Sequence, residues 1–270
     1  MTPEQNASSE IDLSGAPMRF HFLGLPFDVV GADEAVARIA AVRPDEAFKY
    51  LVTPNVDHVV QASRDVELRA IYDGAWLSLC DSKPIWALSR LTDVKLRHVT
   101  GADLTVRLFR EVAQAGDEIT YIAASEKVAS ETVKAFPQFA IRTFVPPMGV
   151  SRDRAAFQAC VDFALQRPAR FVLIAIGSPQ SERLLHAIAQ HGRGRGLGLS
   201  TGAAVEFMLG HKRRAPRWIQ SLGLEWLHRL ASEPARLWRR YILAIPPLAS
   251  ILVADLRERR ARRDNAANGR

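Results

Sequence analysis

The stretch Phe171-Val-Leu-Ile-Ala-Ile-Gly-Ser-Pro-Gln-Ser-Glu182 joins a short apolar run to the start of a longer amphipathic one. The run has the length of a buried strand, Gly177 permits a tight turn, and Pro179 suits the first turn of a helix. The same alternation recurs from Arg19 onward. It predicts an α/β fold with a mostly parallel, Rossmann-like sheet, flanking helices and a C-terminal basic helical appendage.

The pattern gives element positions and a domain division. Strands are expected at 20–23, 49–53, 76–79, 119–123, 141–144, 171–176 and 197–200. Helices are expected at 33–41, 56–72, 82–91, 103–115, 126–136, 152–165 and 180–190. We expect a disordered leader over 1–17, an α/β core over 18–210, a helical appendage over 211–245 and a basic tail over 246–270.

Positive charge is concentrated at the C-terminal end. The 270-residue chain has a net charge of +7, but residues 211–270 alone carry +9, so the preceding part is slightly acidic. Trp218, Trp226 and Trp238 are interleaved with these cations. Such a segment suits a membrane-surface helix, a nucleic-acid surface or a solvated helical face.

Cysteine usage and metal-ligand patterns exclude several classes. Cys80 and Cys160 belong to no CxxC pair, which favours a reducing compartment, and the chain has no HExxH, Asp-x-Asp or Cys/His cluster. No metal and no cofactor are therefore expected. The apolar run 241–254 is too short to cross a bilayer and contains Pro246-Pro247, so it lies in an interface or packs.

Polar residues follow several expected strands, where ligands collect in open α/β sheets. Thr53 and Asn55 suit hydrogen bonds to a sugar or phosphate, and the nearby Asp57 suits a helix cap. Asp81 is either a general base or a cap of the next helix. Glu206 stands in a turn bounded by two glycines.

The segment from Gly177 to Glu182 and the tail arginines suit an anionic ligand. The turn offers a weak anion-site pattern, although Glu182 also suits a capping box. Arg229, Arg236 and Arg239 recur at spacings that place them roughly on one helical face. Without a metal, such cations would stabilise a diphosphate leaving group; a solvated face is the competing interpretation.

Several motifs in one order carry a resemblance. They are Thr53-Pro-Asn55, Asp81, Val99-Thr-Gly-Ala-Asp103, Gly177-Ser-Pro-Gln180, Gly202-Ala-Ala-Val-Glu-Phe207, Lys212-Arg-Arg-Ala-Pro-Arg-Trp218, Gly223-Leu-Glu-Trp-Leu-His-Arg-Leu230, Glu233-Pro234 and Arg239-Arg240-Tyr241. Over roughly residues 20–241 the chain resembles the WecG/TagA/CpsF family of bacterial glycosyltransferases. As an ordered set the motifs are highly specific.

The resemblance implies metal-independent, inverting transfer from a UDP-sugar to a polyprenyl-diphosphate-linked saccharide, in synthesis of exopolysaccharide, capsule or wall polymer. It implies that Asp81 is the base and that Thr53, Asn55 and Gln180 line the donor pocket. It also implies that Arg229, Arg236 and Arg239 complete the site.

The same resemblance implies a location and further partners. The tail is expected to dock on the anionic inner face of the bacterial cell membrane, which makes the protein cytoplasmic and peripheral. It also implies that homo-oligomer formation depends on the tail.

Three positions depart from the family pattern, and all bear on donor choice. Glu206 replaces an Asp that would reach the nucleotide. Residues 81–84 read Asp-Ser-Lys-Pro in place of Asp-Gly-x-Gly. His98, with Arg97 beside it, replaces an arginine before Val-Thr-Gly, so both are expected to bind substrate.

A different class of function remains open from the sequence. A noncatalytic nucleotide-sugar or nucleic-acid binding protein would also use the basic tail. The glycosyltransferase interpretation predicts no nucleic-acid partner, and Asp81 is the residue that separates the two.

Overall fold

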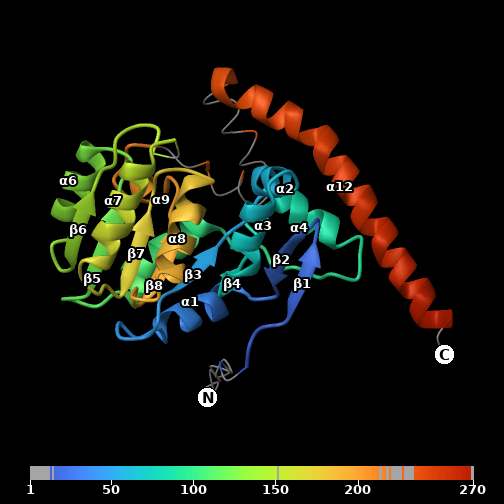
Figure 1. Ribbon diagram of the computed structural model, residues 1–270, viewed down its shortest axis with the longest axis horizontal. Coiled ribbons are helices and arrows are strands. Elements are labelled where there is room, and N and C mark those ends of the chain that lie inside the picture. Colours follow the sequence, from blue (N-terminus) through green and yellow to red (C-terminus); the bar gives the residue numbers. More distant parts are fainter. Residues whose placement is uncertain are drawn as a thin grey trace, which may run out of the picture.

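The computed structural model describes residues 13, 15–150, 152–212, 215–216, 219, 227 and 234–268. Its centre is a six-stranded parallel sheet with the strand order β4-β3-β8-β7-β5-β6 (Figure 1). Helices cover both faces, so the predicted α/β class is confirmed. The expected leader, 1–17, lies largely outside the described residues.

The expected sheet strands are all present. They are β3 (Lys49–Val52), β4 (Leu77–Ser78), β5 (Glu118–Ile122), β6 (Ala140–Phe144), β7 (Phe171–Ile174) and β8 (Leu197–Ser200). The helices are α1 (Ala32–Ala40), α2 (Val56–Ala62), α3 (Val66–Asp73), α4 (Lys83–Ser89), α5 (Gly101–Arg107), α6 (Glu126–Ala135), α7 (Arg154–Leu165), α8 (Gln180–Gln190), α9 (Ala204–Met208) and α12 (Pro234–Asn268).

Side chains of the strands alternate between two hydrophobic cores. Tyr50 and Val52 of β3 join the core beneath α2, α3, α7 and α8, while Leu51 joins the core beneath α1, α5 and α6. A parallel sheet with both faces covered needs apolar residues on both sides of each strand. This requirement explains the continuous apolar runs in the sequence.

Two expected elements differ from the structure. The expected helix 56–72 is two helices, because Asp65 accepts a hydrogen bond from the Leu68 N–H (2.9 Å) and caps a new helix, α3. The expected helix 103–115 starts as α5 and continues as a π-helix, η1 (Leu108–Val112). Neither a new cap within a helical stretch nor a change from α-helix to π-helix alters the apolar periodicity from which the helices were predicted.

The first expected strand lies outside the parallel sheet. β1 (Arg19–Phe22) pairs antiparallel with β2 (Leu25–Asp28), which was not predicted because Pro26 disfavours a strand. The turn between them has positive φ at Leu23 (54°) and Gly24 (78°), as a two-residue hairpin turn requires. Leu23 is buried, although only a few per cent of non-glycine residues adopt this conformation.

The hairpin is held against the sheet by a buried carboxylate. Asp28 accepts two hydrogen bonds from the Arg19 guanidinium (2.8 Å each) and one from the Ser78 N–H of β4 (2.8 Å). The Arg19 Nη2 also donates to the Ala75 carbonyl (2.9 Å). A buried charge that is paired and fully hydrogen-bonded fixes the hairpin on the edge strand.

The C-terminal helix α12 is continuous from Pro234 to Asn268 and includes Pro246 and Pro247. The expected boundary at residue 246 thus falls within one helix, and the separation of appendage from tail stays a prediction. α12 runs beside α2 and α4 toward β1 (Figure 1), and its apolar residues Leu248, Ile251 and Leu252 pack on the core. No described helix is long and apolar enough to span a membrane.

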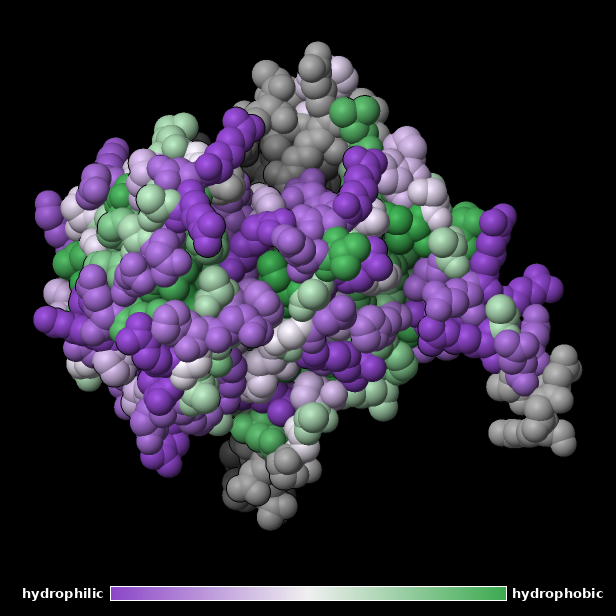
Figure 2. Space-filling view, viewed as in Figure 1, coloured by the Kyte–Doolittle hydropathy of each residue, from purple (hydrophilic) through white to green (hydrophobic). Residues whose placement is uncertain are grey.

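Another side of α12 leaves apolar residues at the surface. Trp238, Ile245, Val253 and Leu256 are exposed, and green surface recurs along α12 in Figure 2. Their spacings of seven, eight and three residues return to one side of a helix. α12 is therefore apolar on two adjoining sides, of which the body covers one.

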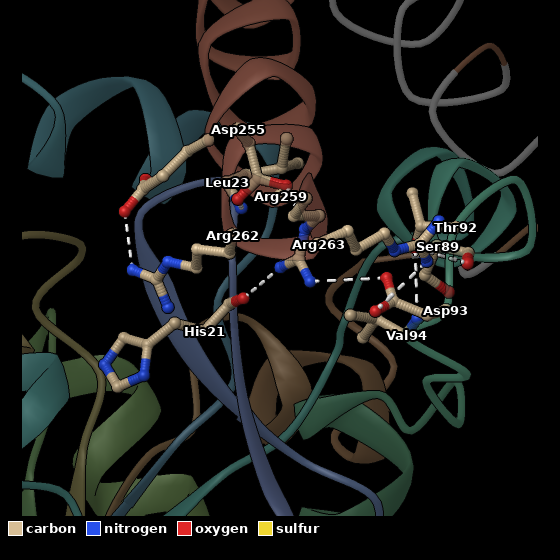
Figure 3. A network of polar contacts seen from close by, with 11 residues as sticks. His21, Leu23, Ser89, Thr92, Asp93, Val94, Asp255, Arg259, Arg262 and Arg263 are labelled. Atoms are coloured by element: carbon tan, nitrogen blue, oxygen red, sulfur yellow. Dashed lines mark hydrogen bonds and ion pairs between the residues drawn. The ribbon is translucent and has the colours of Figure 1, made fainter. Parts of the chain in front are cut away.

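A polar clamp fixes the distal part of α12 to the body (Figure 3). Asp255 accepts a hydrogen bond from the Leu23 N–H (3.1 Å). Arg259 donates to Asp255 (2.6 Å) and to the His21 carbonyl, and it lies 3.5 Å from Asp93. The clamp thus joins α12 both to the strained hairpin turn and to the loop after α4.

Gly196 should be far less tolerant of alanine than Gly192. Both have positive φ, but a Cβ on Gly196 would lie 2.3 Å from the Ala169 carbonyl oxygen, whereas Gly192 has nothing within 4 Å. We expect Gly192→Ala to lower the free energy of unfolding by about 1 kcal/mol. Gly196→Ala should lower it by about 3 kcal/mol, because overpacking adds to the strain. Urea unfolding measures both, and equal losses would contradict the expectation.

Arg259→Ala should loosen α12, whereas Arg262→Ala should not. Arg262 is the matched control because in the described part of the chain it pairs with Glu258 of the same helix. Hydrogen bonds to charged groups contribute about 1.5–3 kcal/mol, so amide exchange over 248–263 should accelerate roughly tenfold or more in Arg259→Ala. Hydrogen-exchange mass spectrometry measures this rate, and unchanged exchange would show that the clamp does not hold the helix.

Candidate active site

Four neighbouring strands of the sheet deliver the predicted site residues to one edge. β4, β3, β8 and β7 are adjacent and parallel, so their carboxyl ends lie side by side. Thr53 follows β3 and Asp81 follows β4, while Glu206 and Gln180 lie on the helices that follow β8 and β7. This edge is where open α/β sheets bind ligands.

Asp81 does not cap the helix that follows it. Ser82 is the N-cap of α4 and accepts a hydrogen bond from the Ile85 N–H (3.3 Å). Asp81 instead accepts a hydrogen bond from the Gly101 N–H at Oδ2 (3.0 Å), and its own N–H donates to the Pro54 carbonyl (3.2 Å). Asp81 therefore does not cap α4, and its Oδ2 binds the N–H of the first residue of α5.

Gly101 brings Thr53 and Asp81 together. A Cβ at Gly101 would lie 2.7 Å from Thr53 Oγ1 and 3.6 Å from Asp81 Oδ2. Only a residue without a side chain allows this approach. Sequence reasoning missed this role of Gly101, and the only signal was its place in the Val-Thr-Gly-Ala-Asp motif.

Asn55 has a structural role that the sequence assigned to its neighbour. It is the N-cap of α2, and its Oδ1 accepts hydrogen bonds from the N–H groups of Asp57 (3.0 Å) and His58 (3.4 Å). The expected capping by Asp57 is therefore wrong. The amide nitrogen of Asn55 has no hydrogen bond among the described residues, so it still has a donor for a ligand.

Gln180 lies at the start of α8 and lines a cavity of about 580 Å³ between α3, α7 and α8. With its amide nitrogen toward the preceding turn, it donates to the carbonyls of Gly177 (3.2 Å) and Ser178 (3.0 Å). The cavity wall also includes Arg183 and His186, and burial lowers the pKa of His186. Asp81 is not among the residues that line this cavity.

Buried polar atoms without partners surround the start of α8. Among the described residues, Ser181 Oγ and Glu182 Oε2 lack a hydrogen bond. The suggested capping box of Glu182 is absent, since α8 has no side-chain cap. An unpaired buried polar group costs about 1–3 kcal/mol, but these two atoms have almost no accessible surface and do not line the cavity, so they do not extend the ligand site.

Arg97 and His98 line a second pocket, of about 420 Å³, together with Lys83, Trp86 and Arg90. The backbone of His98 pairs with that of Cys80, the residue before Asp81, through an isolated parallel bridge, and Asp81 itself is not among the lining residues. The sequence indicated Arg97 and His98 but missed Trp86 and Arg90. Trp86 and Arg90 reach the pocket only because α4 is helical, and no sequence motif marks them.

The predicted turn around Glu206 is wrong, since this residue lies within a short helix, α9. Lys212 donates to its carboxylate (2.8 Å), and its backbone carbonyl accepts from the His211 N–H (2.9 Å). The negative charge of Glu206 contributes, after burial, to a raised pKa of Tyr121. The carboxylate therefore has a cationic partner at the carboxyl end of β8.

The structure describes the backbone of two of the three arginines that were expected to complete the site. Arg229 lies outside the described residues, as do Trp218 and Trp226. Arg236 and Arg239 lie on α12, three residues apart and so on one side of the helix, while their side chains lie outside the described part. Their role stays a prediction.

The described residues contain no group of three or more His, Cys, Asp or Glu side chains placed to hold a metal ion. The thiols are buried, which raises the pKa of Cys80 to about 12 and that of Cys160 to about 11. Neither cysteine is therefore a thiolate near neutral pH.

A comparison with protein family models identifies the family of this chain. The model described as the Glycosyl transferase WecG/TagA/CpsF family matches residues 20–263. The match runs from the hairpin, through every strand of the sheet and both pockets, into the clamped part of α12. The chain therefore belongs to the WecG/TagA/CpsF family of glycosyl transferases.

Proposed function

We propose that this transferase moves a sugar from a UDP-sugar to a polyprenyl-diphosphate-linked saccharide, with inversion and without a metal. The observation that carries this proposal is the position of Asp81. This carboxylate lies at the carboxyl end of the sheet, and it does not cap α4 because Ser82 does. A carboxylate at the edge of the sheet where ligands bind suits general-base catalysis. The product would be a lipid-linked intermediate of exopolysaccharide, capsule or wall-polymer synthesis.

In the proposed reaction Asp81 takes the proton from the acceptor hydroxyl. The hydroxyl oxygen forms a bond to the anomeric carbon as the bond from that carbon to UDP breaks. A single displacement of this kind inverts the anomeric configuration. The Gly101 N–H holds Asp81 Oδ2 (3.0 Å) and so fixes the orientation of the carboxylate for proton transfer.

The donor would bind through polar groups at the neighbouring strand ends. Thr53 contributes a hydroxyl beside Asp81, and Asn55 contributes an amide nitrogen. Gln180 would bind the nucleotide diphosphate from its cavity, with Glu206 at the nucleotide. The departing UDP gains negative charge, which Arg229, Arg236 and Arg239 would stabilise in place of a metal.

The protein is proposed to work at the inner face of the bacterial cell membrane. The exposed apolar side of α12 and the cations of residues 211–270 would bind an anionic surface together. Each basic residue near such a surface contributes about 1 kcal/mol. Homo-oligomer formation would depend on whether the tail covers the assembly surface.

Asp81→Asn should lose sugar transfer while still binding UDP. Loss of a general base typically lowers the rate about 10²–10⁴-fold, and the amide is nearly isosteric with the carboxylate. Mass spectrometry of the product from a UDP-sugar panel and a short-chain prenyl-diphosphate sugar measures transfer. Asp162→Asn, on the exposed side of α7, is the matched control. Full turnover by Asp81→Asn would remove it as the base.

Ile245→Asp combined with Leu256→Asp should weaken binding to anionic vesicles several-fold, because each apolar side chain contributes about 1.5–3 kcal/mol when it leaves water. Co-sedimentation with vesicles of mixed anionic and neutral lipids measures the bound fraction. Met148→Asp with Val66→Asp places the same charges on exposed apolar residues elsewhere. Equal loss in both variants would contradict a specific role of α12.

A further inference from the structure

We infer that the pocket formed by Lys83, Trp86, Arg90 and Arg97 binds the diphosphate of the acceptor, with Trp86 against the apolar chain that the diphosphate carries. The inference rests on the proposed function and adds to it. It assigns this anion site to the lipid-linked substrate and not to the nucleotide. A cluster of cations on an aromatic surface is the observation behind it.

Helix α4 presents two cations around one ring. Lys83, Trp86 and Arg90 are three and four residues apart, so they share one side of the helix. The Lys83 ammonium lies 5.2 Å from the centre of the Trp86 ring, and the Arg90 guanidinium lies 5.8 Å from it. Both cations thus lie against the same ring, which attracts each of them.

The pocket has positive charge without a described counter-charge. Its lining contains Lys83, Arg90, Arg97 and His98 but no Asp or Glu. No ion pair joins Lys83, Arg90 or Arg97 to another described residue. Several unpaired cations around one concavity raise the local concentration of anions.

Nearby carboxylates are committed to other cations. Asp93 lies in the same loop as Arg97, but it pairs with Arg259 (3.5 Å) and Arg263 (3.4 Å) of α12. Asp33, next to the lining residue Ala32, pairs with Arg107 (2.8 Å). These pairs leave the pocket cations to an external anion.

Size and composition favour a diphosphate ester with an apolar chain. The volume of about 420 Å³ lies within the range of about 300–1,000 Å³ for small-ligand sites. Trp86, Leu96 and Ala32 add apolar surface to the cationic wall. A guanidinium group binds two phosphate oxygens at once, and the lysine adds a point charge.

The position of the pocket suits the acceptor. Lys83 follows Asp81 by two residues, and His98 of the lining pairs with Cys80. An acceptor whose diphosphate lies here would have its saccharide within reach of the Asp81 carboxylate. Gln180 lines a different cavity, which leaves separate room for the nucleotide.

Calorimetric titration of the full-length chain with farnesyl diphosphate, inorganic pyrophosphate and UDP tests the inference. Lys83→Gln combined with Arg90→Gln should weaken binding of farnesyl diphosphate roughly tenfold or more, with UDP affinity changed less than about twofold. Trp86→Ala should weaken farnesyl diphosphate but not pyrophosphate. Lys127→Gln with Arg110→Gln removes the same charges from exposed positions elsewhere and should change none of these affinities.

Two results would overturn the inference: unchanged farnesyl diphosphate binding in the Lys83/Arg90 variant, or an equal loss of UDP binding. In transfer assays the same variant should raise KM for the prenyl-diphosphate sugar roughly tenfold and leave KM for the UDP-sugar unchanged. Binding needs no turnover, so the two proposals fail separately. Prenyl diphosphate binding through these residues without any transfer would overturn only the proposed function.

Discussion

The parallel alignment of β4, β3, β8 and β7 is the constraint on which the site depends. Because all four strands run in one direction, the segments that leave them emerge at one edge, and residues distant in sequence become neighbours. Thr53 and Asp81 meet there only because Gly101 has no side chain. The site is therefore a property of strand direction and of one close approach, and neither is visible in any single motif.

Helix α12 contributes a second constraint that acts through charge. Its Arg259 and Arg263 pair with Asp93, the acidic residue of the loop that also carries Arg97. Asp255 of the same helix accepts a hydrogen bond from the N–H of the buried Leu23, so the hairpin turn, the loop and α12 hold one another in place. The C-terminal helix thus pairs with a carboxylate of the loop that also carries a cation of the pocket.

Sequence patterns predicted the sheet well because burial on both faces demands apolar runs of strand length. They failed where a local cue competed with the tertiary structure. Pro26 disfavoured a strand where β2 forms. The predicted boundary at residue 246 falls within one helix, α12, whose packing on the core extends past both prolines, and the division into appendage and tail stays a prediction. For Asp81 the sequence left two roles open, general base and cap of the next helix; Ser82 caps that helix, and the role of Asp81 as base stays a prediction. The pocket around Trp86 was missed because its cations converge only when α4 forms.

The charge requirements of the proposed reaction would account for two groups of cations. In that reaction donor and acceptor would each carry a diphosphate, and two such anions in one site repel each other strongly where the dielectric is low. One set of cations cannot neutralise both while it also stabilises the charge that develops on the leaving UDP. Lys83, Arg90 and Arg97 are part of the α/β domain and not of the tail, so they would be in place before the acceptor arrives. The arginines of the tail would then act on the donor side, where charge changes during transfer. Such a division lets the acceptor bind without competing for the cations that the transition state needs.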